Sequence, residues 1–376
     1  MRKENLRVAE QKKLEIDPKY LSILGFTSFL PTKKSQYDKY EIIDKNAQAT
    51  QQQKQETEIV EIHNLEQHST QKDLDNNAEN VSVEPSHRHT KTHVTTTPFN
   101  GTKSNFSIVT YVQDGQAPSA ILLSQHVAAK FPNEYLLIYD LGLSEEESRA
   151  LNTYCNSSKC SVIGYDLSVF PSYVSDQRMH AYRPIVIKDA LMRSKSILFA
   201  ENYMRIRGSS RELYELHSKV MVSGVLGWNT PTAVSTRTHP KMFDYFQTDA
   251  DDFYFLRMVD LDTILFTDSL FVTEKIMLPW IKCALTLECL DPIGAQSNGC
   301  KYNKKPQYRY SGCHGYDTSA FNIVLGLTWH LDDTKYSMPS DMYDIFYKET
   351  LEQATKILEN RRRNSSETSE HPFTEP

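Results

Sequence analysis

The stretch from Asn105 to Asn202 alternates short apolar runs with segments of helical spacing, and this alternation limits the possible folds most. The apolar runs, which we predict to be buried strands, are Asn105–Val112, Glu134–Leu143, Cys160–Leu167 and Ser196–Asn202. The segments between them have helix signals, including a Ser144–Glu147 capping box and a proline at the start of the third segment. Alternating strands and helices are typical of a parallel sheet covered by helices on both faces. We therefore predict an α/β fold with a mostly parallel sheet.

Composition divides the chain into three predicted regions. Residues 1–98 contain polar runs such as NAQATQQQKQETE and no aromatic residue after Tyr40, so we predict a disordered tail or stem. Residues 99–358 are rich in Tyr, Phe, Leu and Ile and form the predicted single folded domain, and residues 359–376 form a predicted disordered tail. Within the first region, Tyr20–Leu30 is the most apolar segment, but polar residues and a glycine interrupt it. We expect it to be a short binding or collapsed segment rather than a targeting signal.

The net charge of −6 gives no basic surface for a nucleic acid, so we predict no nucleic-acid partner. No run of about 18 apolar residues occurs, and the sequence therefore predicts no membrane span. Six cysteines lie in the predicted folded region without a CxxC pair, and the easiest local bridge joins Cys155 to Cys160. Glycosylation acceptor patterns occur at Asn80, Asn100, Asn105, Asn156 and Asn364. Together these features favour the secretory lumen, with a reduced cytoplasmic protein as the alternative.

Ligands of parallel sheets gather beyond the carboxyl ends of the strands. The candidate residues at those predicted ends are Thr110, Tyr111, Asp140, Asp166 and Glu201. The sequence contains neither GxGxxG nor GxxxxGK[ST], the usual phosphate-binding loops. A phosphate ligand would therefore need another source of positive charge, most simply a divalent metal held by carboxylates.

Two acidic segments are alternative candidates for that metal. The first is Glu201, with Arg205 four residues on, and its simpler explanation is a surface ion pair between these two residues. The second is the DxD pair of Asp260 and Asp262, whose simpler explanation is a solvated strand end or turn. Both explanations stay open at this point.

Near the C-terminus, YSGCHGYDTSAFNIVL combines a Cys-His pair and an Asp with the start of an apolar helix. We predict that Asp317 or Thr318 caps this helix and that its apolar residues enter the core. These apolar residues are Ala320, Phe321, Val324 and Leu325. The segment 342–363 is predicted to close the fold as an amphipathic helix.

Four blocks, IYDLGLS, HPKMFDYF, LPWIKCALTLECLDPIG and GCHGYDTSAFNIVL, resemble in the same order an animal family of secretory-pathway proteins. That family is assigned to the nucleotide-sugar glycosyltransferases of the GT-A type, and the last block is similar to that of glycogenin-like transferases. The resemblance spans Thr110 to Trp329. It implies a Rossmann-like GT-A fold and transfer of a sugar from a UDP-sugar to a glycan or protein acceptor, assisted by Mn²⁺. It also implies location in the Golgi.

The resemblance implies residue roles as well. Glu201 stands at the first position of the metal motif, with Tyr203 where a second carboxylate would be. His314 is a further predicted metal ligand or, alternatively, a phosphate contact. Asp317 is the predicted contact to the acceptor hydroxyl or donor sugar, with Asp260 and Asp262 on the acceptor side. The predicted nucleotide-binding residues are Thr110, Tyr111, Asp140, Arg183 and Arg205.

Gly315 and Thr318 replace the family's arginine and glutamine in this last block. These departures make a catalytically weakened or inactive binding protein with the same fold the alternative function. A third hypothesis is a hydrolase that uses Asp260 and Asp262 as paired carboxylates.

Overall fold

The computed structural model describes residues 16–26, 102–303, 305–339 and 345–369, with side chains described up to residue 364. The strands are β1 Ser107–Val112, β2 Tyr135–Asp140, β3 Cys160–Gly164, β4 Ser196–Ala200, β5 Met204–Ile206, β6 Val225–Ala233, β7 Arg257–Val259, β8 Thr263–Thr267, β9 Ser337–Pro339 and β10 Phe346–Lys348. The helices are α2 Pro18–Ile23, α4 Ala117–Lys130, α5 Glu145–Tyr154, α6 Tyr182–Arg193, α7 Ser210–Ser223, α8 Pro240–Tyr245, α9 Leu278–Ala284, α10 Leu287–Leu290, α11 Asp317–Thr328 and α12 Leu351–Ser369. Short helical turns are η2 Leu167–Val169, η3 Ser172–Ser175, η4 Val234–Arg237, η5 Ala250–Phe253, the π-helical η6 Val272–Met277 and η7 Asp333–Lys335.

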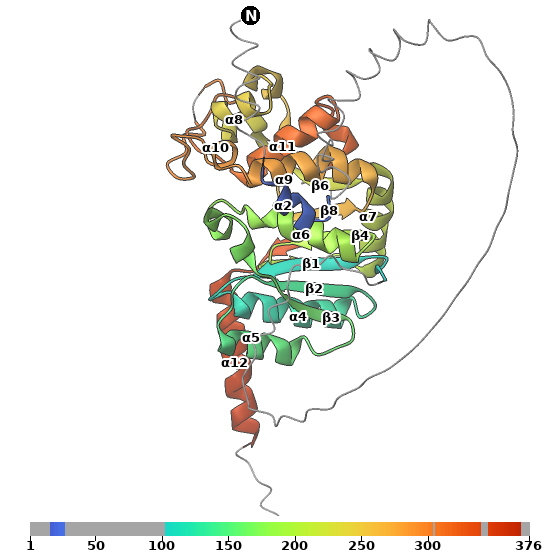
Figure 1. The fold of residues 1–376 in the computed structure, drawn as a ribbon. Helices are drawn as coiled ribbons and strands as arrows, with labels where there is room; N and C mark the ends of the chain where they lie inside the picture. Colours follow the sequence, from blue (N-terminus) through green and yellow to red (C-terminus); the bar gives the residue numbers. More distant parts are fainter. Residues whose placement is uncertain (1–15, 27–101, 304, 340–344, 370–376) are drawn as a thin grey trace, which may run out of the picture. The chain divides into compact units, whose positions relative to one another are not determined.

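The main sheet has the order β3-β2-β1-β4-β8-β6-β7, with β9 paired to β6 (Figure 1). Its first four strands are parallel, which confirms the prediction made from the alternating segments. Beyond β4, the pairs of β4 with β8, β6 with β8 and β6 with β7 are antiparallel. A short antiparallel pair of β5 and β10 stands apart from this sheet.

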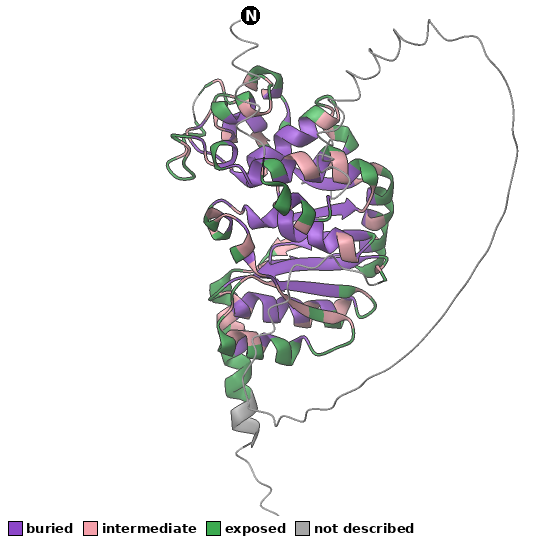
Figure 2. Cartoon of the chain, viewed as in Figure 1, coloured by how far each residue is buried: buried purple, intermediate pink, exposed green. Residues whose placement is uncertain are grey.

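Helices cover both faces of the sheet, as the sequence predicts. On the face of α4, α5, α7 and α12, sheet residues such as Ile108, Leu198 and Leu265 pack into one core cluster with the helices (Figure 1). On the opposite face, α6, α9 and α11 bury aromatic rings such as Phe266, whose ring centroid lies 6.4 Å from that of Trp280. Strands β1, β4 and β8 are buried along their whole length, whereas the edge strand β3 is only partly buried (Figure 2).

The described residues of the predicted N-terminal tail differ from the prediction. Residues 18–23 form α2, which begins after Asp17, whose side chain accepts a hydrogen bond from Lys19 N. Leu24 and Phe26 that follow are fully buried. The rest of residues 1–98 lies outside the described part of the chain, except for 16–26.

The C-terminal prediction also needs correction. The helix expected over 342–363 begins only at Leu351 and runs to Ser369, past the expected start of a tail at 359. Residues 346–348 instead form β10, which pairs with β5. Residues 342–344 lie outside the described part.

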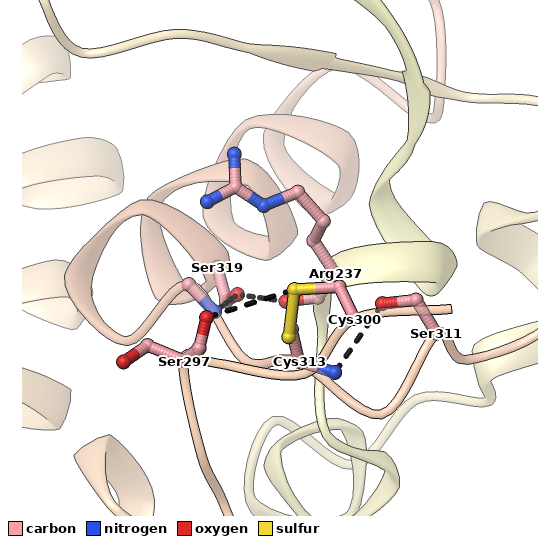
Figure 3. Close-up of a disulfide and its surroundings, with 7 residues drawn as sticks. Arg237, Ser297, Cys300, Ser311, Cys313 and Ser319 are labelled. Atoms are coloured by element: carbon pink, nitrogen blue, oxygen red, sulfur yellow. Dashed lines mark hydrogen bonds between the residues drawn. A yellow bond between two sulfur atoms is a disulfide. The ribbon is translucent and has the colours of Figure 1, made fainter. Parts of the chain in front are cut away.

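Three disulfides cross-link the domain. They join Cys155 to Cys160, as predicted, Cys283 to Cys289 and Cys300 to Cys313. The third closes the loop that leads into α11, beside Arg237 and Ser319 (Figure 3). None of the helices among the described residues is long and apolar enough to cross a membrane.

Candidate functional site

The two acidic segments that the sequence presents as alternatives belong to one site. Strand β4 ends at Ala200, which pairs with Thr263 at the start of antiparallel β8. Glu201 follows the end of β4 and Asp262 precedes β8, so the pairing places them side by side. The Glu201 N–H donates a 2.9 Å hydrogen bond to the carbonyl oxygen of Asp262.

Arg183, on α6, joins Glu201 to Asp317. Its Nε and Nη2 donate to Oε1 of Glu201 at 3.1 and 2.8 Å, and its Nη1 donates to Oδ2 of Asp317 at 2.7 Å. The exposed fraction is 5% for Arg183, 2% for Glu201 and 0% for Asp317. A buried charge is tolerated only when it is paired and hydrogen-bonded, and this arginine meets both conditions with two carboxylates. The expected surface pair of Glu201 with Arg205 is therefore wrong, because Glu201 is buried and pairs with Arg183.

Burial raises the pKa of both Asp317 and Glu201. It raises the pKa of Asp317 to about 7, against the lowering effect of the Arg183 charge, and the Glu201 charge adds to the rise. The pKa of Glu201 is also raised by burial, with Arg183 opposing. Asp317 thus has the pKa of a group that exchanges protons near neutral pH.

Each carboxylate oxygen of Asp262 has its own side-chain partner. The Tyr203 hydroxyl donates to its Oδ1 at 2.7 Å, and Lys348 of β10 forms an ion pair with its Oδ2. The Asp262 N–H in turn donates to Oδ1 of Asp260 at 3.2 Å. Burial and the Asp262 charge raise the pKa of Asp260.

Asn322 connects this acidic turn to α11. Its Oδ1 accepts from the Val259 N–H at 2.7 Å, and its Nδ2 donates to the carbonyl oxygens of Val259 and Thr318 at 2.9 and 2.8 Å. Val259 ends β7 directly before Asp260. One amide therefore sets the position of Asp260 relative to the first turn of α11.

The start of α11 differs from the predicted cap. The helix begins at Asp317, Tyr316 occupies the N-cap position with a φ of 48°, and no side chain caps it. A positive φ is uncommon for a residue with a side chain and marks local strain. Instead of capping, the Asp317 carboxylate bonds Arg183, and its carbonyl oxygen accepts from Trp280 Nε1 at 2.9 Å. The four predicted core residues of α11 are buried, which confirms that part of the prediction.

Gly315 fits a crowded position. A Cβ atom there would lie 2.9 Å from Oγ of Ser319. That hydroxyl accepts from the Gly315 N–H at 3.0 Å and donates to the carbonyl oxygen of Arg237 at 2.7 Å (Figure 3). The Gly315 N–H also donates to the same carbonyl at 2.9 Å. A side chain at position 315 would therefore clash with the Ser319 hydroxyl unless that hydroxyl moved.

The predicted metal ligands do not fit a metal. Both ring nitrogens of His314 are occupied, because Nδ1 accepts from the His239 N–H at 3.1 Å and Nε2 lies 3.0 Å from the carbonyl oxygen of Leu290. Burial lowers the pKa of His314 to about 4, consistent with a neutral ring that donates from Nε2. Glu201 is bound to Arg183. Across the described ranges, no group of three or more His, Cys, Asp or Glu side chains could hold a metal ion.

Three of the predicted nucleotide-binding residues, Thr110, Asp140 and Tyr111, differ from one another in their contacts. Thr110 is fully buried within β1, and Asp140 accepts from the N–H groups of Gly142 and Leu143 in the turn after β2. Tyr111 points to the face of α6, and its ring lies 4.9 Å from that of Tyr182.

Arg183 belongs to the acidic site, whereas Arg205 turns away from it. Arg205 donates to Glu349 at 2.9 Å and to backbone carbonyl oxygens, including that of Asn202 at 2.7 Å. The structure therefore brings Arg183 together with the acids and leaves Arg205 outside.

Sequence reasoning assigned no role to Lys348, Asn322 or Arg237. Arg237 ends η4 beside the disulfide of Cys300 and Cys313, and its guanidinium extends away from the sulfur atoms (Figure 3). Its Nε is buried, and no side chain of the described residues bonds the guanidinium. The sequence signal for Arg237 was weak, since it lies in the plain segment VSTRTHP.

No protein-family model and no curated protein matches the chain. Several solved structures that match part of it are glycosyltransferases. The bifunctional glycosyltransferase WbbM is 13% identical over 59% of this chain and 37% of its own, with a TM-score of 0.38. Mouse xyloside xylosyltransferase 1 is 10% identical over 62% of this chain and 84% of its own, with a TM-score of 0.34.

The galactosyltransferase LgtC, solved with donor and acceptor sugar analogs, is 14% identical over 43% of this chain and 57% of its own, with a TM-score of 0.30. The chain therefore spans about a third of WbbM and just over half of LgtC. With TM-scores below 0.5, these likenesses give no information on the reaction.

Proposed function

We propose that the protein transfers a sugar from a UDP-sugar to an acceptor hydroxyl, with Asp317 as the general base that acts through the Thr318 hydroxyl. The observation that carries the proposal is the buried Asp317 carboxylate with a pKa of about 7, joined through Arg183 to the acidic turn beyond β4. A general base works best when its pKa lies near the working pH.

Thr318 links the buried base to the substrate. Its hydroxyl is half-buried and donates to Oδ1 of Asp317 at 3.3 Å, whereas Asp317 itself is fully buried. In the proposed step Thr318 passes its hydroxyl proton to Asp317 and takes the proton of the acceptor hydroxyl. The acceptor oxygen forms a bond to the anomeric carbon, the bond from that carbon to the diphosphate breaks, and its electron pair leaves with the nucleoside diphosphate.

Arg237 is the proposed contact for the leaving diphosphate. Its buried Nε has no hydrogen-bond partner among the described residues, and its carbonyl oxygen accepts from the Gly315 N–H and the Ser319 hydroxyl at the start of α11. Arginine matches phosphate oxygens with two parallel hydrogen bonds. Asp260 and Asp262 would bind hydroxyls on the acceptor side, with Tyr203 and Lys348 holding Asp262 in place.

We also propose that the protein works in the lumen of the secretory pathway. Its three disulfides persist in an oxidising compartment. A glycan or protein acceptor in that lumen fits this location.

A screen of UDP-sugars tests the reaction, with release of UDP and glycosylation of an added acceptor as readouts. Asp317→Asn keeps the size of the side chain and removes the base, so turnover should fall by about 10²-fold or more. Thr318→Val should lower turnover as well, whereas Thr318→Ser should retain it. Wild-type protein that binds no UDP-sugar and releases no UDP would contradict the proposal.

A further inference from the structure

We infer that Arg183 takes the place of a divalent metal at this site, so that the protein binds its nucleotide-sugar without metal. The part that concerns the nucleotide-sugar rests on the function proposed above. The part that concerns the metal rests only on the side chains around Arg183.

The carboxylates that a metal would use are already bound by the guanidinium. Glu201 receives two hydrogen bonds from Arg183 on one oxygen, and Asp317 receives the third on Oδ2. Divalent metals such as Mg²⁺ and Mn²⁺ bind through carboxylate oxygens, so a metal and Arg183 compete for the same lone pairs. The second Arg183 contact of Nη1, to Oγ1 of Thr318 at 3.4 Å, fixes its orientation further.

Arg183 cannot leave this position readily. It lies on the second residue of α6, 5% exposed, between two carboxylates that are themselves at most 2% exposed. Moving the guanidinium out would leave both carboxylates buried without a partner, which is strongly unfavourable. A planar guanidinium that spans two carboxylates is also the side chain best suited to this arrangement.

The other acids of the site have partners from the protein too. Asp262 is paired with Lys348 and Tyr203, and Asp260 accepts from the Asp262 N–H. His314, the other predicted ligand, uses both ring nitrogens on backbone groups. The carboxylates that a metal would bind are therefore already paired with two side chains of the chain itself, Arg183 and Lys348, and Arg237 remains the proposed contact of the diphosphate.

The first experiment measures Mn²⁺ binding alone, from the loss of the free Mn²⁺ signal in electron paramagnetic resonance. Wild-type protein should take up no stoichiometric Mn²⁺. The variant Arg183→Met frees Glu201 and Asp317, so Mn²⁺ should raise its Tm and leave that of wild type unchanged. Arg193→Met is the matched control, because it lies on the same helix but pairs with Asp189. If Arg183→Met does not fold, the wild-type titration still decides.

The second experiment titrates UDP into wild-type protein by calorimetry, in EDTA and in Mn²⁺. The Kd should change by less than about threefold between the two, far below the tenfold that corresponds to about 1.4 kcal/mol. Stoichiometric Mn²⁺ uptake that Glu201→Gln abolishes, or UDP binding that requires Mn²⁺, would overturn the inference and leave the proposed function standing. Absence of UDP binding in both buffers would count against the proposed donor, and the Mn²⁺ titration would then decide the inference by itself.

Discussion

The Tyr203 hydroxyl donates a 2.7 Å hydrogen bond to Oδ1 of Asp262, a residue 59 positions further along the chain. Tyr203 stands two residues after Glu201, at the position where the resemblance implies a second carboxylate. The tyrosine does not replace that carboxylate as a ligand. It brings in a carboxylate from another strand, because Asp262 lies at the start of β8 next to the end of β4.

Replacing Tyr203 by Phe tests this connection. The change removes one hydrogen bond to a charged group, so the free energy of unfolding should fall by about 1–2 kcal/mol. Turnover should fall by more than the loss of stability explains, because the position of the Asp262 side chain then depends on its ion pair with the exposed Lys348. Chemical denaturation and turnover measure the two effects. The exposed Tyr214, changed to Phe, is the control, and equal behaviour of the two variants would refute the role of Tyr203.

The pH dependence of transfer should follow Asp317. The proposed base must be ionised, and its pKa is raised to about 7, so kcat/KM should increase as the pH rises through about 7. Initial rates between about pH 5 and 9 measure the profile. A profile that is flat across neutral pH would argue against Asp317 as the base.

The stability of the fold should change with pH in the opposite direction to the rate of transfer and decrease as the pH rises. A carboxyl whose pKa is higher in the folded state binds its proton more tightly when the protein is folded. The contribution of Asp317 to the free energy of unfolding is therefore complete below its unfolded pKa of about 3.9 and is lost as the pH rises through about 7. Asp317→Asn should therefore flatten the fall in Tm over this interval. An Asn variant whose Tm falls as steeply as that of wild type would contradict the assignment.

Asn322→Ala should be strongly destabilising, because it leaves the buried Val259 N–H and two carbonyl oxygens without their side-chain partner. We expect a loss of about 2–4 kcal/mol in the free energy of unfolding. The exposed Asn152 also bonds a backbone carbonyl, and its change to Ala should cost far less. Urea unfolding of both variants makes the comparison, and similar losses would mean that Asn322 does not fix the acidic turn.

His314→Ala should act on stability and not on metal binding. The change leaves the His239 N–H and the Leu290 carbonyl oxygen without their buried partner, at a cost of about 2–4 kcal/mol. The exposed His330, which has a φ of 51°, can be changed to Asn as a control because Asn tolerates this backbone conformation. Thermal unfolding with and without Mn²⁺ separates the two roles, and a Mn²⁺ effect present in wild type but lost in His314→Ala would restore His314 as a ligand.

The parallel half of the sheet was predictable because each of its strands can be recognised from its own residues and those next to it in the sequence. Each of β1, β2 and β3 is a separate apolar run that a helix separates from the next strand, and a parallel sheet with right-handed crossovers follows from that order. The positions of Glu201 at a strand end and of Asp317 at a helix start were predictable for the same reason.

The connection between these residues was not predictable. The antiparallel pairing of β4 with β8 joins segments about 60 residues apart, and neither segment has a pattern that names its partner. Arg183 stands in an apolar helix start, so its sequence gives no sign that it lies between two carboxylates 18 and 134 positions away. The role of Lys348 was also not predictable, because the sequence around it predicted a helix where β10 forms.

Helix α2 has a consequence for the connectivity of the chain. Phe26 is fully buried, with Lys188 Nζ 5.1 Å from the centre of its ring, and Tyr20 lies against Phe170 with ring centroids 5.7 Å apart. Helix α2 thus packs on the domain although residues 27–101 separate it in sequence from the segment that leads into β1. We therefore expect that cleavage of the chain between Phe26 and Thr102 leaves the fragment with α2 bound to the domain, because Leu24 and Phe26 are fully buried in it. Size-exclusion chromatography of the cleaved protein would test this.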